Sequence, residues 1–389
     1  MRVSRPKRKR TMGDIDYGVF YTVALLVAIG VVMVYSASSY YAMFTYKDSM
    51  FFLKRQLINV GIGIAVMMFT MSFDYHKLKK YTIAMMIICF PLLIAVFFFP
   101  GVNGAQRWIL LGPLSFQPSD LVKYVVVLFL AMSLEIKGEG VKKFSTGIVP
   151  YLGVSGIYAA LVLAEKNLSI ASVIMIVTFI ILFAAGGRIK HLFGIVAPAM
   201  VAAAVAFTVL EPYRMLRMLN FTNPWKDPAG AGYQLIQSFY ALGAGGITGL
   251  GLGQSRQKTL YMPEPHNDFI FAIIGEELGL IGCICIIALF IIFIWSGIKV
   301  AMKARDTYGT LLAVGITSVI AVQSLINIAV VTGSMPVTGV PLPFISYGGT
   351  SLIINMMAVG ILLNISRQVE GKEDVELISK NRTAYNKWL

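Results

Sequence analysis

The chain has 389 residues, of which 57% are hydrophobic and only 13% are charged, and its mean hydropathy is +0.75. Soluble domains carry about 25% charged residues, so this composition excludes a soluble globular protein. The long apolar runs do not alternate in polarity, which excludes the strands of an outer-membrane barrel and favours membrane-spanning helices. The net charge of +14 is scattered between these runs, as expected for signals of membrane orientation and not for a nucleic-acid surface. The three cysteines lie in apolar runs and indicate neither a disulfide framework nor a metal site.

The sequence predicts an all-α integral membrane protein with about ten transmembrane helices and a long extracytoplasmic loop between the seventh and the eighth. The first apolar run is longer than the roughly 7–15 residues of a signal-peptide core, so it is expected to remain as the first span. The expected spans are 17–39, 56–73, 81–99, 121–134, 147–164, 168–186, 191–210, 269–298, 308–333 and 350–366.

Basic residues in the short connections predict the orientation of the spans. If the basic arm at residues 1–16 is cytoplasmic and the spans alternate, every clearly basic short loop falls on the cytoplasmic side, as the positive-inside rule requires. The expected division is a cytoplasmic arm at 1–16, a polytopic membrane domain at 17–367 and a cytoplasmic tail at 368–389. The loop residues behind this assignment are Lys77, Lys79, Lys80, Lys137, Lys142, Lys143, Arg188, Lys190, Lys299, Lys303 and Arg305.

Three connections on the outer side are unusual. Segment 100–120 is too polar for a span, and its Arg107 and Trp108 suit the membrane interface. Segment 334–349 carries three prolines and a Gly-Gly pair, so it is expected to be an irregular segment packed on protein. Segment 211–268 is the longest connection, and its apolar, glycine-rich middle predicts that it folds against the bundle.

An acidic cluster marks the start of the eighth expected span, with Glu264, Asp268, Glu276 and Glu277. A carboxylate at or inside a membrane is costly without a partner or a task. Asp268 stands where a polar loop becomes an apolar helix, and two roles are open to it: a helix-capping acid, or a general base or metal ligand. For the two glutamates, ion pairing with a neighbouring span is the favoured interpretation.

Several cationic side chains are expected on the same outer side. Lys123 lies one turn after Asp120, which indicates either an ion pair or a cation that faces an anionic substrate. Arg55 lies at the outer end of the second expected span, where it either reaches the headgroups or contacts substrate. His266 is expected in an exposed loop, as a solvated residue or a neighbour that tunes Asp268. Together with Asp268, these cations suit a lipid-linked phosphate substrate.

A glycine run lies in the long outer loop and has two interpretations. It lacks the Gly-Lys-Ser/Thr ending and the preceding strand of a phosphate-binding loop, so close packing of helices through small residues is favoured. The run consists of Gly243, Gly245, Gly246, Gly249, Gly251 and Gly253.

Several longer motifs resemble the SEDS family of membrane proteins (shape, elongation, division and sporulation), whose members include FtsW, RodA and SpoVE. The resemblance extends over about 14–367 and is closer to the FtsW and SpoVE branch, as judged from Tyr261 and Asn267. The matching pieces are Gln106-Arg107-Trp108, GPLSFQPSD at 112–120, GYQLIQS at 232–238, GLGQSRQKTLYMPEPHNDFIFAIIGEELG at 251–279 and PVTGVPLPFISYGG at 336–349.

The resemblance implies a peptidoglycan glycosyltransferase that polymerises lipid II on the outer face of the cytoplasmic membrane. The acceptor 4-hydroxyl would attack the anomeric carbon of the donor, and undecaprenyl pyrophosphate would leave. Asp268 matches the family's essential acid, and Arg55 and Lys123 match its cations. A divalent cation, Mg²⁺ or Mn²⁺, is implied as a cofactor, with Asp268 as a candidate ligand, and a class B penicillin-binding protein as the partner transpeptidase. The candidate substrate-binding residues are Arg55, Arg107, Asp120, Lys123, Lys258, Glu264, His266 and Ser346.

Two departures from the family pattern limit this inference. Asp120 replaces a longer Glu found in many members, and the run Glu165–Ser169 replaces Pro-Asp-Leu-Gly-Thr, so no acidic role transfers to Asn167. Two other functions remain open: a flippase for the lipid-linked precursor, and a scaffold without catalytic activity. The lack of a convincing inverted repeat and the concentration of motifs on the outer face disfavour the flippase.

Overall fold

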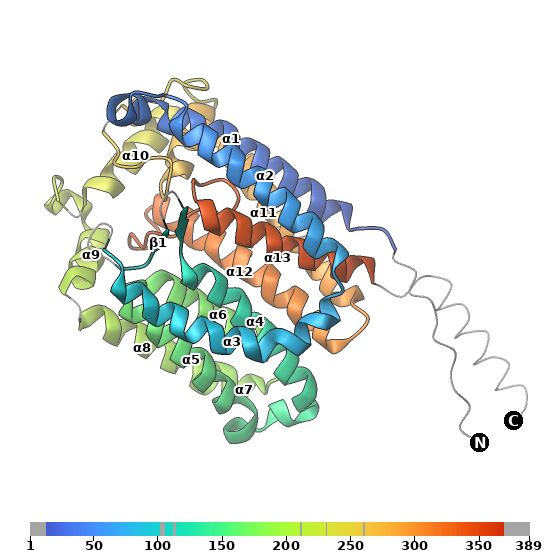
Figure 1. Cartoon of the computed structure of the whole chain (residues 1–389). Helices are drawn as coiled ribbons and strands as arrows, with labels where there is room; N and C mark the ends of the chain where they lie inside the picture. Colours follow the sequence, from blue (N-terminus) through green and yellow to red (C-terminus); the bar gives the residue numbers. More distant parts are fainter. Residues whose placement is uncertain are drawn as a thin grey trace, which may run out of the picture.

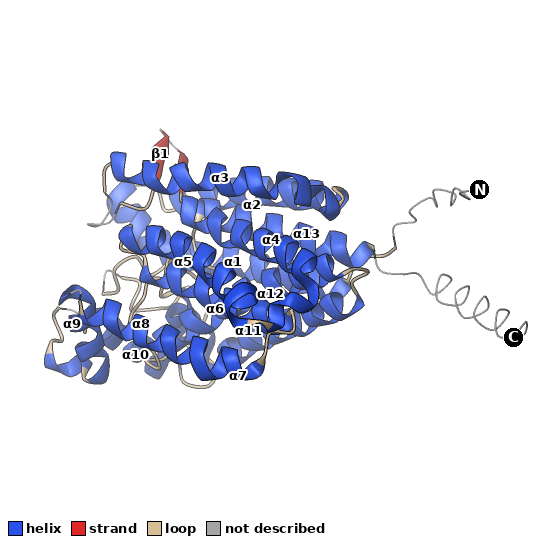
Figure 2. Cartoon of the chain, turned by 90° about the horizontal axis from the view of Figure 1, so that it is seen from below, coloured by secondary structure: helices blue, strands red, loops and turns tan. Residues whose placement is uncertain are grey.

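The computed structural model describes residues 13–101, 106–111, 114–210, 212–230, 232–259 and 261–368. The predicted basic arm lies almost entirely outside the described residues, and so does the predicted tail beyond residue 368. The described chain is a bundle of long helices whose axes run roughly side by side, with the irregular connections gathered at one end (Figures 1 and 2).

The fold class is the expected one, because apolar stretches of this length satisfy all of their backbone hydrogen bonds internally as helices. The helices are α1 (Tyr17–Tyr46), α2 (Phe51–Ser72), α3 (Leu78–Ala95), α4 (Pro118–Lys137), α5 (Val149–Ala164), α6 (Leu168–Ala184), α7 (Ile189–His191), α8 (Ala197–Val209), α9 (Pro212–Thr222), α10 (Tyr233–Gly245), α11 (Ile270–Lys303), α12 (Thr307–Val331) and α13 (Gly349–Arg367). Short 3-10 or π turns extend them at Tyr75–Lys77, Val96–Phe98, Gly138–Lys142, Phe144–Ile148, Leu192–Val196 and Pro224–Lys226.

The predicted count of about ten spans is not confirmed. Within the described residues, eight helices are long and apolar enough to cross a membrane, and α6 is a shorter apolar helix. Helix α4 has 20 residues but carries four charged side chains, which is polar for a span. The eight are Tyr17–Tyr46, Phe51–Ser72, Tyr75–Phe98, Phe144–Ala164, Ile189–Val209, Ile270–Lys303, Thr307–Val331 and Gly349–Arg367.

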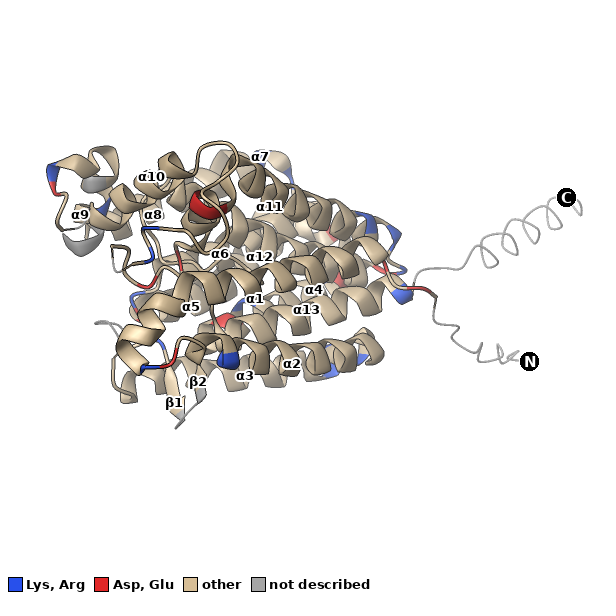
Figure 3. Ribbon diagram, turned by 90° about the horizontal axis from the view of Figure 1, so that it is seen from above, with Lys and Arg blue, Asp and Glu red and all other residues tan. Residues whose placement is uncertain are grey.

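Charge is distributed along the bundle as a membrane protein requires. Figure 3 shows most lysines and arginines near the end from which both termini leave and at the opposite end, where the irregular connections lie. Near the termini, Tyr75, His76 and Asp306 form a polar cluster, in which the Tyr75 hydroxyl donates to Asp306 Oδ1 at 2.6 Å. The opposite end carries the segments that the sequence singled out.

Segment 100–120 is not a span, as expected, and it contains the only strands among the described residues. Strands β1 (Ile109–Leu111) and β2 (Leu114–Phe116) pair in antiparallel fashion, with Ile109 opposite Phe116. This hairpin leads directly into α4, whose second and third residues are Ser119 and Asp120. It therefore fixes the start of α4.

The long connection 211–268 folds against the bundle, as predicted. Helix α10 packs on α11 through Gly245, where an added Cβ would lie 1.9 Å from the carbonyl oxygen of Gly275. Only glycine permits this approach, so the small-residue interpretation of the glycine run is confirmed at this position.

Helix α11 is broken at Gly279, which has φ 66° and ψ −166°. The segment that follows α10 fills the break: Leu250 N donates to the Glu276 carbonyl at 3.0 Å, and Leu280 N donates to the Gly246 carbonyl at 2.9 Å. The backbone groups freed by the break are thus satisfied within the protein, as membrane depth requires. The break divides α11 into a short part next to Asp268 and a long apolar part.

The segment between α12 and α13 is irregular, as its prolines predicted. Val340, Leu342, Phe344 and Ile345 are all at most 2% exposed, so the segment is packed on protein. It is hydrogen-bonded to the loop that precedes α11, and this contact builds the candidate active site.

Candidate active site

Asp268 lies just outside α11, which begins at Ile270 after the N-cap residue Phe269. Its side chain is half-buried, and within the described part of the chain no hydrogen bond holds its carboxylate. Asp268 is therefore not the helix cap, and this structural alternative for it is wrong. Its carboxylate is left accessible for a proton or a ligand.

The backbone of Asp268 is held by a side chain from α12. Asn327 Nδ2 donates to the Asp268 carbonyl oxygen at 2.7 Å and to the Val340 carbonyl oxygen at 2.7 Å. Gly339 lies on the other side, where φ is +75° and an added Cβ would lie 3.2 Å from Asp268 Oδ2. The irregular segment between α12 and α13 thus lies directly against one side of the Asp268 carboxylate.

The electrostatic surroundings of Asp268 raise its pKa to about 6. Burial is the largest cause, and the negative charge of Glu264 adds to it, whereas Arg107 and Arg217 act in the opposite direction. A carboxylate with a pKa close to neutrality is a stronger base than an exposed one and is still ionised at pH 7.

The loop that carries Asp268 is fixed to the segment before α13. Ser346 Oγ donates to the Asn267 carbonyl at 2.8 Å and accepts from Leu342 N at 2.8 Å, and Tyr347 N donates to the His266 carbonyl at 2.9 Å. Ser346 is 5% exposed. Its hydroxyl is engaged in positioning the loop.

Glu264 and His266, two residues apart, have opposite environments. Glu264 is exposed, has φ 46°, and accepts from Asn267 Nδ2 at 2.8 Å. His266 is 2% exposed, and burial lowers its pKa to about 4. Its ring packs against Phe52 with centroids 4.2 Å apart. The expectation of an exposed loop histidine is therefore wrong, because the aromatic side chains of Tyr41 on α1, Phe52 on α2 and Tyr347 before α13 pack around it.

Arg55 is exposed on α2, with its guanidinium 4.3 Å from the centroid of the Phe51 ring. It also interacts with the side chain of Tyr347, whose backbone holds the His266 loop. This arrangement leaves a cation near the N-terminal end of α2, close to the loop that carries Asp268.

Lys123 and Asp120 form the i,i+3 ion pair that the sequence indicated, with Nζ 2.8 Å from Oδ1. Both are buried, at 1% and 3% exposure, and Lys123 Nζ also donates to Gln323 Oε1 at 3.1 Å. Gln323 lies one turn before Asn327 on α12. One face of α12 therefore holds both the buried ion pair and the backbone of Asp268.

Arg107 ties the hairpin to the turn between α5 and α6. Its Nε donates to the Glu165 carbonyl at 3.3 Å, and its Nη2 donates to the Lys166 carbonyl at 2.5 Å. Arg107 acts electrostatically on both Asp268 and Glu165. It therefore lies close enough to both carboxyl groups to influence them.

Lys258 is not brought to Asp268 by any contact of the described residues. It is 7% exposed, and its Nζ lies 2.9 Å from Glu277 Oε1 and 3.2 Å from Ser36 Oγ. Its role in substrate binding stays a prediction, and its charge is paired with Glu277 inside the fold. Glu276 is bound by the Ser255 hydroxyl and by Arg256 N at 2.9 Å. Both glutamates thus have buried partners, from the preceding loop and from α1.

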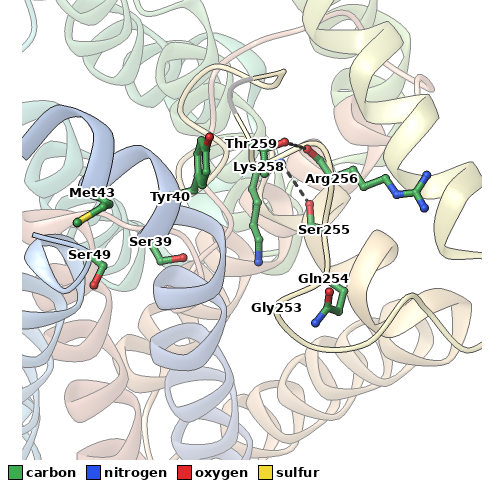
Figure 4. A pocket seen from close by; sticks show the side chains of 10 residues that line it. All are labelled: Ser39, Tyr40, Met43, Ser49, Gly253, Gln254, Ser255, Arg256, Lys258 and Thr259. Atoms are coloured by element: carbon green, nitrogen blue, oxygen red, sulfur yellow. Dashed lines mark hydrogen bonds between the residues drawn. The ribbon is translucent and has the colours of Figure 1, made fainter. Parts of the chain in front are cut away.

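A groove of about 600 Å³ opens beside this buried network, between the C-terminal end of α1 and the segment 253–259 (Figure 4). In Figure 4 the side chain of Arg256 points away from that of Lys258. Asp268 does not line this groove. The groove and the Asp268 region are therefore separate features of the same face.

A divalent cation would have to be shared with a substrate. No group of three or more His, Cys, Asp or Glu side chains suited to a metal occurs among the described residues. Mg²⁺ is commonly bound by one or two carboxylates together with substrate phosphates, and the accessible Asp268 fits that mode.

Sequence inspection found Asp268, Arg107 and the Lys123–Asp120 pair but missed their supports. Gln323 and Asn327 are polar residues four apart in an otherwise apolar span, and that pattern alone marks a functional face. Glu165 and Gly339 gave no comparable signal, because their importance depends on what the fold packs against them.

Comparisons with known proteins agree with this arrangement. Residues 17–371 match the family model FTSW_RODA_SPOVE, described as cell cycle protein. The chain is 46% identical to stage V sporulation protein E of Bacillus subtilis over 347 residues, which cover 88% of this chain and 94% of that protein. It is 41% identical to the probable peptidoglycan glycosyltransferase FtsW of Geobacter sp. strain M18, over 93% of this chain and 99% of that protein.

Solved structures share the fold. A chain from a structure titled "Structural coordination of polymerization and crosslinking by a peptidoglycan synthase complex" superposes with a TM-score of 0.76 at 29% identity, covering 91% of this chain and 98% of that one. The rod shape determining protein RodA of Thermus thermophilus superposes with a TM-score of 0.68 at 23% identity, over 92% of this chain and 98% of that one. This multi-pass membrane protein belongs to the FtsW/RodA/SpoVE family.

Proposed function

We propose that the chain is a peptidoglycan glycosyltransferase that polymerises lipid II at the outer face of the cytoplasmic membrane. The observation that carries this proposal is the half-buried carboxylate of Asp268, whose pKa of about 6 is set among cations at one end of a membrane bundle. The relatives named as probable peptidoglycan glycosyltransferases support it.

In this reaction Asp268 is the general base. It takes the proton of the acceptor 4-hydroxyl as that oxygen bonds to the anomeric carbon of the donor, and the bond from that carbon to undecaprenyl pyrophosphate breaks. The base must be ionised and weakly solvated: the half-buried position beside Gly339 limits its solvation, and a pKa of about 6 leaves it ionised at pH 7.

The cations serve the leaving group. The positive charge of Arg107 acts on Asp268, and Arg55 lies at the outer end of α2 near the same loop. Fixed positive charges near a developing pyrophosphate stabilise the transition state more than free water does. Asp268 is the residue that would hold Mg²⁺ or Mn²⁺, and the ion would supply positive charge to neutralise the leaving pyrophosphate.

The orientation follows from charge. The N-terminal arm and the tail are cytoplasmic, and the end of the bundle that carries Asp268 is extracytoplasmic, because the basic short loops then face the cytoplasm. A class B penicillin-binding protein is the partner that would crosslink the product. The similar chain in the peptidoglycan synthase complex that coordinates polymerization and crosslinking supports this partner.

The decisive experiment measures glycan strands formed from lipid II by the purified chain, with and without a candidate transpeptidase and divalent cations. Wild type is expected to form strands and Asp268→Asn is not, with both variants equally folded in detergent. Glycan strands from both proteins would show that a group other than Asp268 is the general base. Strands from neither under any condition would refute the glycosyltransferase.

A further inference from the structure

Glu165 is a buried carboxyl group that the reaction described above does not use. It lies in the turn between α5 and α6, its side chain is 1% exposed, and neither carboxyl oxygen has a hydrogen-bond partner of normal geometry. An ionised carboxylate in this position would lose its hydration, and its neighbours offset only part of that cost, so the neutral acid is favoured.

Three groups face Glu165 from the elements packed against it. Arg107 comes from the segment before β1, and Ser119 and Asp120 come from the first turn of α4. Burial raises the pKa of Glu165 to about 8, because the opposing effects of Arg107 and Ser119 are smaller and Asp120 acts with the burial. At neutral pH the carboxyl group therefore carries a proton.

The protonation state of Glu165 sets the charge of its neighbourhood. Arg107 and Lys123 contribute two positive charges and Asp120 one negative charge, so the cluster of Arg107, Asp120 and Lys123 carries 2 − 1 = +1. Ionisation of Glu165 would reduce this to 2 − 2 = 0 and remove the attraction for an anion.

We propose that Glu165 is a positioning residue kept as a neutral carboxylic acid, which leaves the cluster of Arg107, Asp120 and Lys123 with net positive charge toward a lipid-linked pyrophosphate. This inference rests on the proposed function, since it names a determinant of donor binding at the same site. Glu165 acts through its neighbours and need not touch substrate.

The first test is the pH dependence of the KM for lipid II in wild type and Glu165→Gln. Glutamine has the same shape and cannot ionise. Between pH 7 and pH 9 the KM of wild type should rise about fivefold or more, because ionised Glu165 adds one negative charge close to the bound pyrophosphate. The KM of Glu165→Gln should change by less than about twofold over the same range.

A matched control is Glu139→Gln, because Glu139 pairs with Lys142 at the opposite end of α4 and its side chain is 87% exposed. This variant should show the same alkaline rise in KM as wild type. Asp268 and His266, with pKa values of about 6 and 4, do not change charge between pH 7 and pH 9, so they cannot produce the rise.

A second test does not require activity. A carboxyl whose folded-state pKa is raised contributes stability that is present below its unfolded pKa and is lost as pH rises through the folded value. The difference in melting temperature, Glu165→Gln minus wild type, should therefore increase from pH 5 to about pH 8 and then level off. The same difference for Glu139→Gln should stay flat.

The outcomes separate this inference from the proposed function. A wild-type KM that is constant from pH 7 to pH 9, or an equal rise in Glu165→Gln, would overturn the inference while the glycosyltransferase stands. A chain that forms no glycan would refute the glycosyltransferase, and the melting experiment would still decide whether Glu165 is neutral. A flat melting difference would show that Glu165 is ionised in the folded protein.

Discussion

Asn327, near the C-terminal end of α12, holds the backbone of Asp268, with Nδ2 2.7 Å from the Asp268 carbonyl oxygen. The same amide group binds the Val340 carbonyl at 2.7 Å, so a single side chain joins the loop before α11 to the segment before α13. The carboxylate of Asp268 is thereby positioned without being engaged.

Replacing Asn327 should therefore reduce turnover more than substrate affinity. In Asn327→Leu the Asp268 carbonyl loses its donor, and we expect kcat to fall about 10- to 100-fold, because small displacements of a base are costly. Steady-state polymerisation kinetics would measure the split between kcat and KM. Thr332→Ala is the matched control, since the Thr332 hydroxyl donates to carbonyls of its own helix and is exposed.

Asp268→Asn should abolish polymerisation and stabilise the fold. The raised pKa of about 6 means that ionised Asp268 costs stability, and this cost appears as pH rises from about 4 to 6. At pH 7 the variant should be more stable, by on the order of 2–3 kcal/mol from about 1.4 kcal/mol per pKa unit. Thermal unfolding in detergent at pH 4.5 and pH 7 would measure this. An equal difference at both values would contradict the assigned environment.

Wild-type activity should show an acid limb from the same group. Because the general base must be ionised, kcat/KM for lipid II should fall as pH drops through about 6. A pH–rate profile between pH 5 and pH 7.5 would test this, with membrane integration checked at each pH. A profile that is flat down to pH 5 would exclude Asp268 as the titrating base.

The buried Lys123–Asp120 pair should respond asymmetrically to substitution. Lys123→Met leaves a buried carboxylate without its cation, and breaking such a pair typically costs about 3–5 kcal/mol. The double variant Lys123→Met/Asp120→Asn should recover most of this stability but not the polymerisation rate. Recovery of both the stability and the polymerisation rate would show that the pair has only a structural role.

Two glycines in α10 should behave differently although they lie two residues apart. Gly245→Ala places a methyl group 1.9 Å from the Gly275 carbonyl, whereas Gly243 has open space around it. Gly245→Ala should destabilise the fold by more than about 2 kcal/mol. Gly243→Ala should be neutral or stabilising by up to about 1 kcal/mol. Melting temperatures in detergent would compare the two.

The sequence by itself determined the class of protein and most of the helices. Long apolar runs must form helices in a membrane because unsatisfied backbone groups are too costly there, and this rule depends on composition alone. The irregular path of segment 334–349 and the ion pair of Asp120 with Lys123 could also be predicted from the sequence. Both depend on local features, namely prolines in the segment and a spacing of three residues in a helix. Composition did not decide the number of spans, because α4 carries four charged side chains within 20 residues.

The tertiary structure alone decided which polar groups are exposed. His266, Lys258 and Glu165 are a loop histidine, a loop lysine and a turn glutamate in the sequence, yet all three are buried. Burial depends on residues hundreds of positions away, such as Ser36 beside Lys258 and Phe52 beside His266. The shifted pKa values of Asp268 and Glu165 arise from the same long-range packing, because the loss of water around a carboxyl group is a property of the assembled fold.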